Sequence, residues 1–178
     1  MLTIWKSLVQ SKLDYCSQLW SPSDQGSIGN LESVARNFTS QVGGLAELRM
    51  YSQERRRERY QIIYVWKVSQ LHVSGYTLPF RHHPRRGRLV DLPPVANGAP
   101  AAVKNAQEAN LRVKIAKLFN SLQQELRNLD KVTVDTFKSN LDSWLEGVPD
   151  QPTISGRQRA AESNSLLHQV IMLDNFNL

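Results

Sequence analysis

A proline- and glycine-rich stretch in the middle of the chain sets the tightest limit on what the protein can fold into. Five of the eight prolines in this 178-residue chain lie between Pro79 and Pro100, and glycines occupy positions 75, 87 and 98. Proline lacks the backbone donor that a helix needs, and its ring clashes with the preceding turn, so a continuous helix is excluded here. We therefore predict an extended connector over residues 74–106.

On both sides of the connector, apolar residues recur at three- and four-residue steps, the spacing of amphipathic helices. One stripe starts at Trp5 and stops before Pro22, a second runs from Ile28 to Val42, and Ser52 is a suitable cap for a third helix. The pattern predicts an all-α fold, with two groups of amphipathic helices joined by a Pro-rich basic connector. The expected segments are a helical lobe over residues 1–73, the connector over 74–106, a helical pair over 107–147 and a polar, partly helical tail over 148–178.

The positive charge of the chain is concentrated in its middle third. Residues 49–117 carry fourteen basic and four acidic side chains, a balance of +10, whereas the net charge of the whole chain is only +6. The segments before and after are both slightly acidic. A local excess of this kind indicates a surface for a polyanion better than a uniformly basic sequence does.

The sequence also favours an intracellular location, cytoplasmic or nuclear. Its longest apolar run, Ile62 to Trp66, is far too short to cross a bilayer, so no membrane partner is expected. The N-terminus lacks a secretory pattern because Lys6 and Lys12 interrupt the apolar positions. A single cysteine, Cys16, cannot form an internal disulfide and fits a reducing compartment.

Side chains for catalysis are missing from the chain. No two aspartates are adjacent, so there is no paired-aspartate site for metal-assisted phosphoryl transfer. His82 and His83 stand among arginines, which repel a cation, and we expect them in a solvated loop without a metal. Cys16 lies on the apolar stripe of the first helix, where an inert core thiol is expected. The chain is therefore not expected to be an enzyme by itself, nor to carry a cofactor or metal.

Five stretches in the same order resemble the region downstream of the polymerase core in reverse transcriptases of non-LTR (LINE-type) retrotransposons, especially jockey-like elements. They cover nearly the full length: SKLDYCSQLWSPSD (11–24), IGNLESVARNFTSQVGGL (28–45), YSQERRRERYQIIYVWKV (51–68), AKLFNSLQQELRNL (116–129) and VDTFKSNLDSWLEGVPDQP (134–152). The resemblance implies a non-catalytic, thumb-side helical piece of an RNA-directed DNA polymerase. It also implies that the catalytic aspartates and the endonuclease of the parent enzyme lie upstream of Met1.

Two departures from the family pattern suggest a shortened or degenerating copy. Members of the family have a helical tract with a Glu-Arg-Leu core where only residues 46–50 stand here, and Gln123 occupies a position where proline is common. Loss of apolar partners predicts an isolated chain of marginal stability. We expect it to self-associate through Tyr64, Val65 and Trp66.

In the segment 51–68, the charged residues occupy the first half of the expected helix and the apolar residues the second half. Four arginines lie within positions 55–59, and the apolar residues that follow are distributed on every side of the helix, so the second half must be buried. Pairing of Glu54 and Glu58 with other arginines leaves Arg56 and Arg59 as candidate phosphate contacts. The alternative is a solvated helix start that covers a core with its aliphatic stems.

The connector adds further arginines and has no acid before Asp91. Arginine and lysine contacts to phosphates give affinity without sequence specificity. The candidate nucleic-acid-binding residues are Arg56, Arg59, Arg81, Arg85, Arg86, Arg88, Arg112, Lys114 and Lys117.

The leading functional hypothesis is a non-catalytic fragment that contacts the backbone of RNA or DNA and, as the resemblance implies, the polymerase core of its parent protein. The alternative is a helical protein-interaction or structural module with no nucleic-acid role, in which Trp5, Trp20, Trp66 and Trp144 anchor helices.

Overall fold

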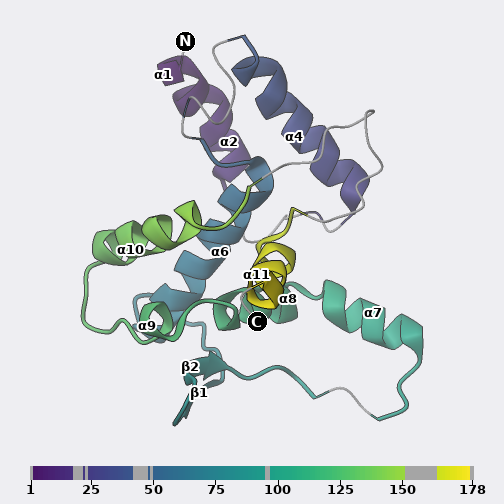
Figure 1. The fold of residues 1–178 in the computed structure, drawn as a ribbon, viewed down its shortest axis with the longest axis vertical. Coiled ribbons are helices and arrows are strands. Elements are labelled where there is room, and N and C mark those ends of the chain that lie inside the picture. Colours follow the sequence, from purple (N-terminus) through teal and green to yellow (C-terminus); the bar gives the residue numbers. More distant parts are fainter. Residues whose placement is uncertain are drawn as a thin grey trace. The chain divides into compact units, whose positions relative to one another are not determined.

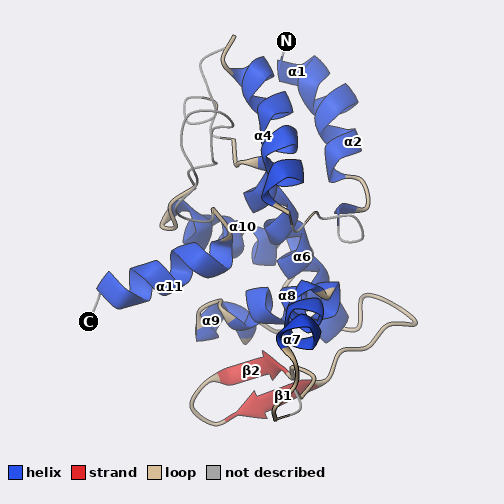
Figure 2. Cartoon of the chain, turned by 90° about the vertical axis from the view of Figure 1, so that its right-hand side faces the viewer, coloured by secondary structure: helices blue, strands red, loops and turns tan. Residues whose placement is uncertain are grey.

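The computed structural model describes residues 2–17, 22, 24–41, 48, 50–94, 97–150 and 164–176. Spatial contacts divide the chain into a terminal unit, Met1–Tyr60 with Pro149–Leu178, and a central unit, Gln61–Val148. The chain is mostly helical, which confirms the coarse fold class, and it contains a small two-stranded sheet that an all-α fold lacks (Figure 2). Each of these units groups residues by contact in space, whereas the predicted segments are consecutive stretches of sequence. The boundaries of the predicted segments therefore stay predictions.

The terminal unit begins with a continuous helical run. It consists of α1 (Leu2–Ile4), the π-helical η1 (Trp5–Gln10) and α2 (Ser11–Asp14), and is followed by α4 (Gln25–Thr39) (Figure 1). Trp5 is buried and stacks on Phe38 of α4, with ring centroids 4.4 Å apart. The apolar stripe starting at Trp5 was predicted to continue toward Pro22, but residues 18–21 lie outside the described part.

The start of helix α6 (Gln53–Ser69) is capped within the terminal unit. Ser52 Oγ accepts the N–H of Arg55 at 3.1 Å, which confirms the predicted cap. The Glu32 carboxylate accepts the N–H groups of Gln53 and Glu54 at 3.0 and 2.7 Å. A carboxylate satisfies the orphan donors of a helix N-terminus and complements its dipole.

The second half of α6 lies in the core of the central unit. Ile62, Val65 and Trp66 are fully buried, which confirms that this half of the helix must be covered. Trp66 stacks on Phe137 of α10 (Val134–Glu146) at 4.5 Å, and its Nε1 donates to Leu129 O at 2.9 Å. Val65 and Trp66 are covered by their own unit and Tyr64 is half-buried, whereas self-association of the chain stays a prediction.

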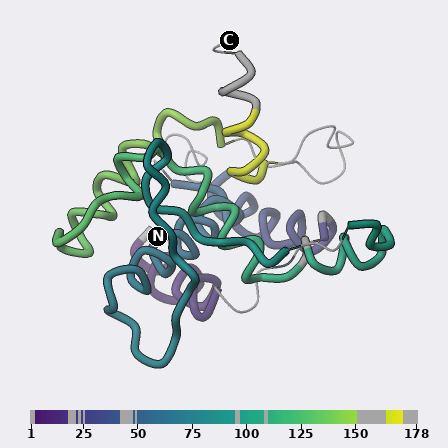
Figure 3. Tube along the Cα trace, turned by 90° about the horizontal axis from the view of Figure 1, so that it is seen from below, coloured from purple at the N-terminus to yellow at the C-terminus, as the bar shows by residue number. Residues whose placement is uncertain are grey.

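The predicted connector is only partly extended. It contains an antiparallel hairpin, β1 (Phe80–His83) and β2 (Gly87–Val90), and helix α7 (Ala101–Ala109). The chain then runs through α8 (Leu111–Asn120) and the short α9 (Gln124–Arg127). Figure 3 shows the coil of α7 set apart from the two strands of the hairpin. Prolines exclude a helix but are compatible with a hairpin turn, which explains why part of the predicted extended connector forms a hairpin.

The tail predicted over residues 148–178 contains α11 (Leu166–Phe176). Its N-terminus is fixed to α6, because Glu58 accepts bonds from Ser165 Oγ at 2.7 Å and from Leu166 N at 2.8 Å. Among the described helices, none combines the length and the apolar character needed to cross a bilayer.

Candidate nucleic-acid interface

The β1–β2 hairpin carries four of the candidate arginines, two on its strands and two on its tight turn. His83 faces Gly87 across the strands, and Pro84, Arg85 and Arg86 make the connection between them. Arg86 N donates to His83 O at 3.2 Å, and Gly87 has a φ of +69°. A turn followed by a left-handed glycine is a common three-residue hairpin connection, and proline suits its first position.

The outer edge of β2 is held by side chains rather than by a third strand. Asn120 Oδ1 accepts Val90 N and Asn120 Nδ2 donates to Val90 O, both at 2.9 Å. Asn128 Oδ1 accepts Arg88 N at 2.8 Å, and Arg127 Nη1 donates to Arg88 O at 3.0 Å. These bonds fix the hairpin to α8 and to the end of α9, so the turn is presented from an anchored strand.

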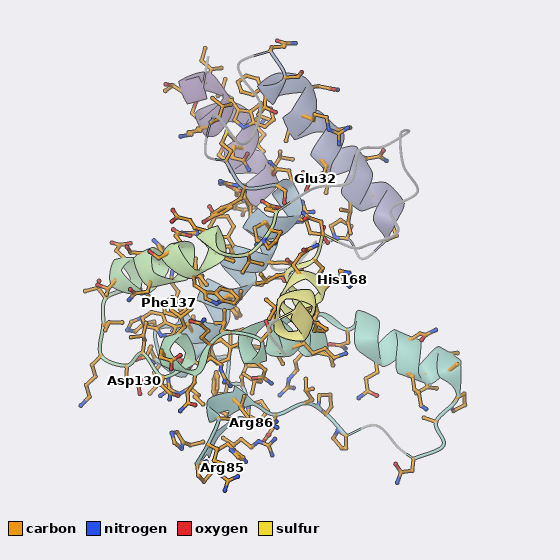
Figure 4. All side chains as sticks on the ribbon, in the orientation of Figure 1. Glu32, Arg85, Arg86, Asp130, Phe137 and His168 are labelled. Atoms are coloured by element: carbon orange, nitrogen blue, oxygen red, sulfur yellow. The ribbon has the colours of Figure 1, made fainter. Side chains whose placement is uncertain are left out.

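Arg85 and Arg86 are the exposed cations of the turn (Figure 4). Neither forms an ion pair with a described residue. The other two hairpin arginines do: Arg81 Nε lies 2.8 Å from Asp91 Oδ1, and Arg88 Nη2 lies 2.6 Å from Asp130 Oδ2. Arg85 and Arg86 can therefore contact a phosphate without breaking an internal ion pair.

Shifts of pKa at the base of the hairpin report the local charge. Burial lowers the pKa of Arg127, with the neighbouring Arg86 acting in the same direction and Glu125 opposing both. The hydrogen bond from Arg88 lowers the pKa of Asp130, and a bond from Gln70 adds to this effect. The positive charge of Arg86 thus acts on the guanidinium of Arg127 and opposes the effect of Glu125.

The three candidate cations on α8 lie differently. Arg112 is exposed at the start of the helix, where the side chain of Asn110 caps its N–H at 2.9 Å. Lys114 and Lys117 are half-buried. Lys117 precedes Asn120 by three residues and so shares its helix face, the face that holds β2.

The arginine-rich start of α6 is mostly buried rather than solvated, and phosphate binding there stays a prediction. Arg55, Arg57 and Glu58 are at most 2% exposed. Arg56, predicted to be unpaired, lies 2.5 Å from Asp14 and also lies over the ring of Tyr60. Periodicity alone could not show this, because the partners come from distant segments.

Arg59, the second α6 candidate, is half-buried, and its guanidinium lies 5.8 Å from the centroid of the Tyr60 ring. Such a position restrains the side chain through a cation–π contact. Arg59 is therefore restrained beside Tyr60, and its contact with phosphate stays a prediction.

Buried charges around Arg57 form the polar core of the terminal unit. Burial lowers the pKa of Arg57, and four carboxylates counteract this effect: Glu32, Glu54, Glu58 and Asp14. Burial raises the pKa of Glu32, and the hydrogen bonds that its carboxylate accepts from Gln53 N and Glu54 N act in the opposite direction. Glu32 of this cluster caps the N-terminus of α6, so the cluster has at least this structural role.

Three further predictions concern metal and thiol chemistry. His82 and His83 lie in β1 and not in a loop, so that expectation is wrong. Cys16 is half-buried in a turn with a φ of +51°, and not on the buried helix face as expected. No group of three or more His, Cys, Asp or Glu side chains that could hold a metal occurs among the described residues.

The anchors of the hairpin were missed by the sequence reasoning. A signal was present, since Pro84 and Gly87 bracket two arginines between short segments of strand-forming residues. That pattern predicts a hairpin, but it cannot identify Asn120, Asn128 or Arg127 as the groups that hold it. Comparisons with protein-family models, with curated proteins and with solved structures found no match for this chain.

Proposed function

We propose that the chain makes sequence-independent contacts to the phosphates of RNA or DNA through the turn of the β1–β2 hairpin. The observation that carries the proposal is the exposure of Arg85 and Arg86 on a turn that leads into β2, a strand held by four side-chain hydrogen bonds. Arginine at an anchored turn loses little additional freedom when it binds a phosphate. Arg112 and Lys117 are proposed as secondary contacts.

We also propose, on the resemblance given above, that this activity belongs to a non-catalytic helical piece of a retrotransposon reverse transcriptase. An intracellular location, cytoplasmic or nuclear, goes with this proposal, as does contact with the polymerase core of the parent protein. The order of five motifs over nearly the full length supports it. The purified chain is expected to incorporate no nucleotides on a primed RNA template.

The test is a titration of fluorescently labelled RNA and DNA, single-stranded and duplex, at several salt concentrations. The variant R85Q/R86Q removes two positive charges, and K6Q/K12Q removes two exposed charges from the terminal unit as a matched control. Each lost phosphate contact should lower the slope of log K against log salt by about 0.7–0.9. We expect R85Q/R86Q to reduce the slope by roughly two contacts, and K6Q/K12Q to leave it close to that of the wild type.

Two results would contradict the proposal. Binding that is micromolar or weaker and insensitive to salt would remove the phosphate role altogether. Equal loss of affinity in the two double variants would show a response to net charge alone, without a site on the hairpin.

A structural or protein-interaction module is the second candidate, and the burial of the arginine-rich start of α6 favours it. Trp5 and Trp66 are buried within their own units and Trp144 is half-buried, whereas Trp20 lies outside the described residues. Buried tryptophans of this kind anchor helices to one another. Unchanged nucleic-acid affinity of R85Q/R86Q, with an unchanged circular dichroism spectrum, would favour this candidate.

A further inference from the structure

The imidazole of His83 accepts two backbone hydrogen bonds inside the hairpin turn. His83 Nδ1 lies 3.2 Å from Arg85 N and 3.2 Å from Arg86 N. Arg86 N also donates to the carbonyl oxygen of His83 at 3.2 Å. The side chain thus accepts from the residues two and three positions ahead, as aspartate and asparagine do in Asx-type turns.

We propose that His83 is the positioning residue of this turn and fixes Arg85 and Arg86 for contact with phosphate. The inference rests on the proposed function, because it assigns to His83 the presentation of those two arginines. Only the neutral imidazole with its proton on Nε2 can accept at Nδ1. His83 is also the last residue of β1 and pairs with Gly87, so one residue closes the ladder and holds the turn.

The backbone of both arginines is thereby fixed at the point where their side chains leave the chain. Pro84 sets one torsion of the turn, and Gly87 supplies the left-handed conformation that follows it. Without the imidazole, the backbone donor of Arg85 would depend on water at an exposed turn, and that of Arg86 would keep only its bond to His83 O. With His83 in place, the two guanidinium groups start from adjacent, restrained positions, and this favours simultaneous contact with neighbouring phosphates.

Two isosteric substitutions separate this role from a general effect on the hairpin. In His83→Asn, the Oδ1 atom stands where Nδ1 stood and can accept the same two N–H groups. In His83→Gln, the terminal amide lies one bond farther out, at the place of Nε2, and the acceptor at the Nδ1 position is gone. Both replacements are neutral and polar, so net charge and hydrophobicity hardly differ between them.

The experiment measures two quantities for the full chain and both variants: hydrogen exchange of the Arg85 and Arg86 amides, and affinity for labelled RNA at low salt. We expect His83→Asn to keep the slow exchange and the affinity of the wild type. We expect His83→Gln to speed exchange most at the Arg85 amide and less at the Arg86 amide, which keeps its bond to His83 O. Its RNA affinity should fall about three- to tenfold, because apparent affinity drops with the population of the competent turn.

Each other result overturns a defined part of the inference. Unchanged exchange in His83→Gln would show that the imidazole does not hold the turn. Faster exchange with unchanged affinity would show that the held turn does not position the arginines. A wild-type chain that fails to bind RNA would overturn the proposed function and the binding part of this inference, while the exchange data would still decide whether His83 holds the turn.

Discussion

Replacement of Gly87 by alanine should weaken the anchored hairpin through two separable effects. The φ of Gly87 is +69°, a left-handed conformation that costs an L-residue about 1–2 kcal/mol. A Cβ atom built on Gly87 would also lie 2.5 Å from Asn128 Oδ1 and 2.9 Å from Asn128 Cγ. The Asn128 amide must move away, and its movement breaks the bond that Oδ1 accepts from Arg88 N at 2.8 Å.

The magnitude follows from these two effects. An N–H group left without its partner costs about 1–3 kcal/mol, so Gly87→Ala should destabilise the central unit by about 2–5 kcal/mol in total. Gly75 supplies a matched control, because its φ is +74° and nothing lies within 4 Å of a Cβ built on it. Gly75→Ala should show the conformational cost alone, about 1–2 kcal/mol.

Urea unfolding followed by circular dichroism gives the stabilities, and amide exchange identifies the bond that is lost. In Gly87→Ala the Arg88 amide should exchange faster, while the Val90 amide, held by Asn120, should stay protected. A double-mutant cycle with Asn128→Ala should be strongly non-additive, because the bond is already broken in the glycine variant. Equal destabilisation at Gly87 and Gly75, or an additive cycle, would refute the reasoning.

Three further perturbations have defined outcomes. Trp66→Phe removes the donor to Leu129 O and should cost about 1–3 kcal/mol in urea unfolding; a cost near zero would contradict the importance of that bond. Glu58→Ala removes both bonds to the start of α11, so the Leu166 amide should exchange faster, whereas unchanged protection would contradict the cap. The lowered pKa of Asp130 adds stability that is present above its unfolded value of 3.8 and is lost as pH falls through the lower folded value. The urea midpoints of Asp130→Asn and wild type should therefore converge under acid, and a constant gap would contradict the ion pair.

Helical content and the covered half of α6 could be predicted from periodicity, because a helix that is apolar on every side has only one stable environment. The burial of the charged first half of α6 could not be predicted in this way. Arg55 and Arg57 are surrounded by groups that lie far away in sequence, such as Glu32 and Pro149 O, and no local pattern reports such partners.

In the connector, by contrast, a local signal was present in the sequence, and the prediction did not use it. Its prolines were interpreted only as helix breakers, although Pro84 and Gly87 also specify a tight turn. Among the four hairpin arginines, Arg85 and Arg86 are those without an acidic partner among the described residues. The sequence alone does not distinguish these two arginines from Arg81 and Arg88. In the three-dimensional structure, Arg81 forms an ion pair with Asp91, and Arg88 forms one with Asp130.

The side chains that saturate the outer edge of β2 also bear on aggregation. An open strand edge is a template on which another chain can add its own strand, and proteins commonly block such edges with charges, prolines or coverage. Here Asn120, Asn128 and Arg127 occupy the edge of β2, and Pro79 and Pro84 flank the short β1. Substitution of Asn120 or Asn128 should therefore cause precipitation or fibril growth at high concentration before any helical content is lost.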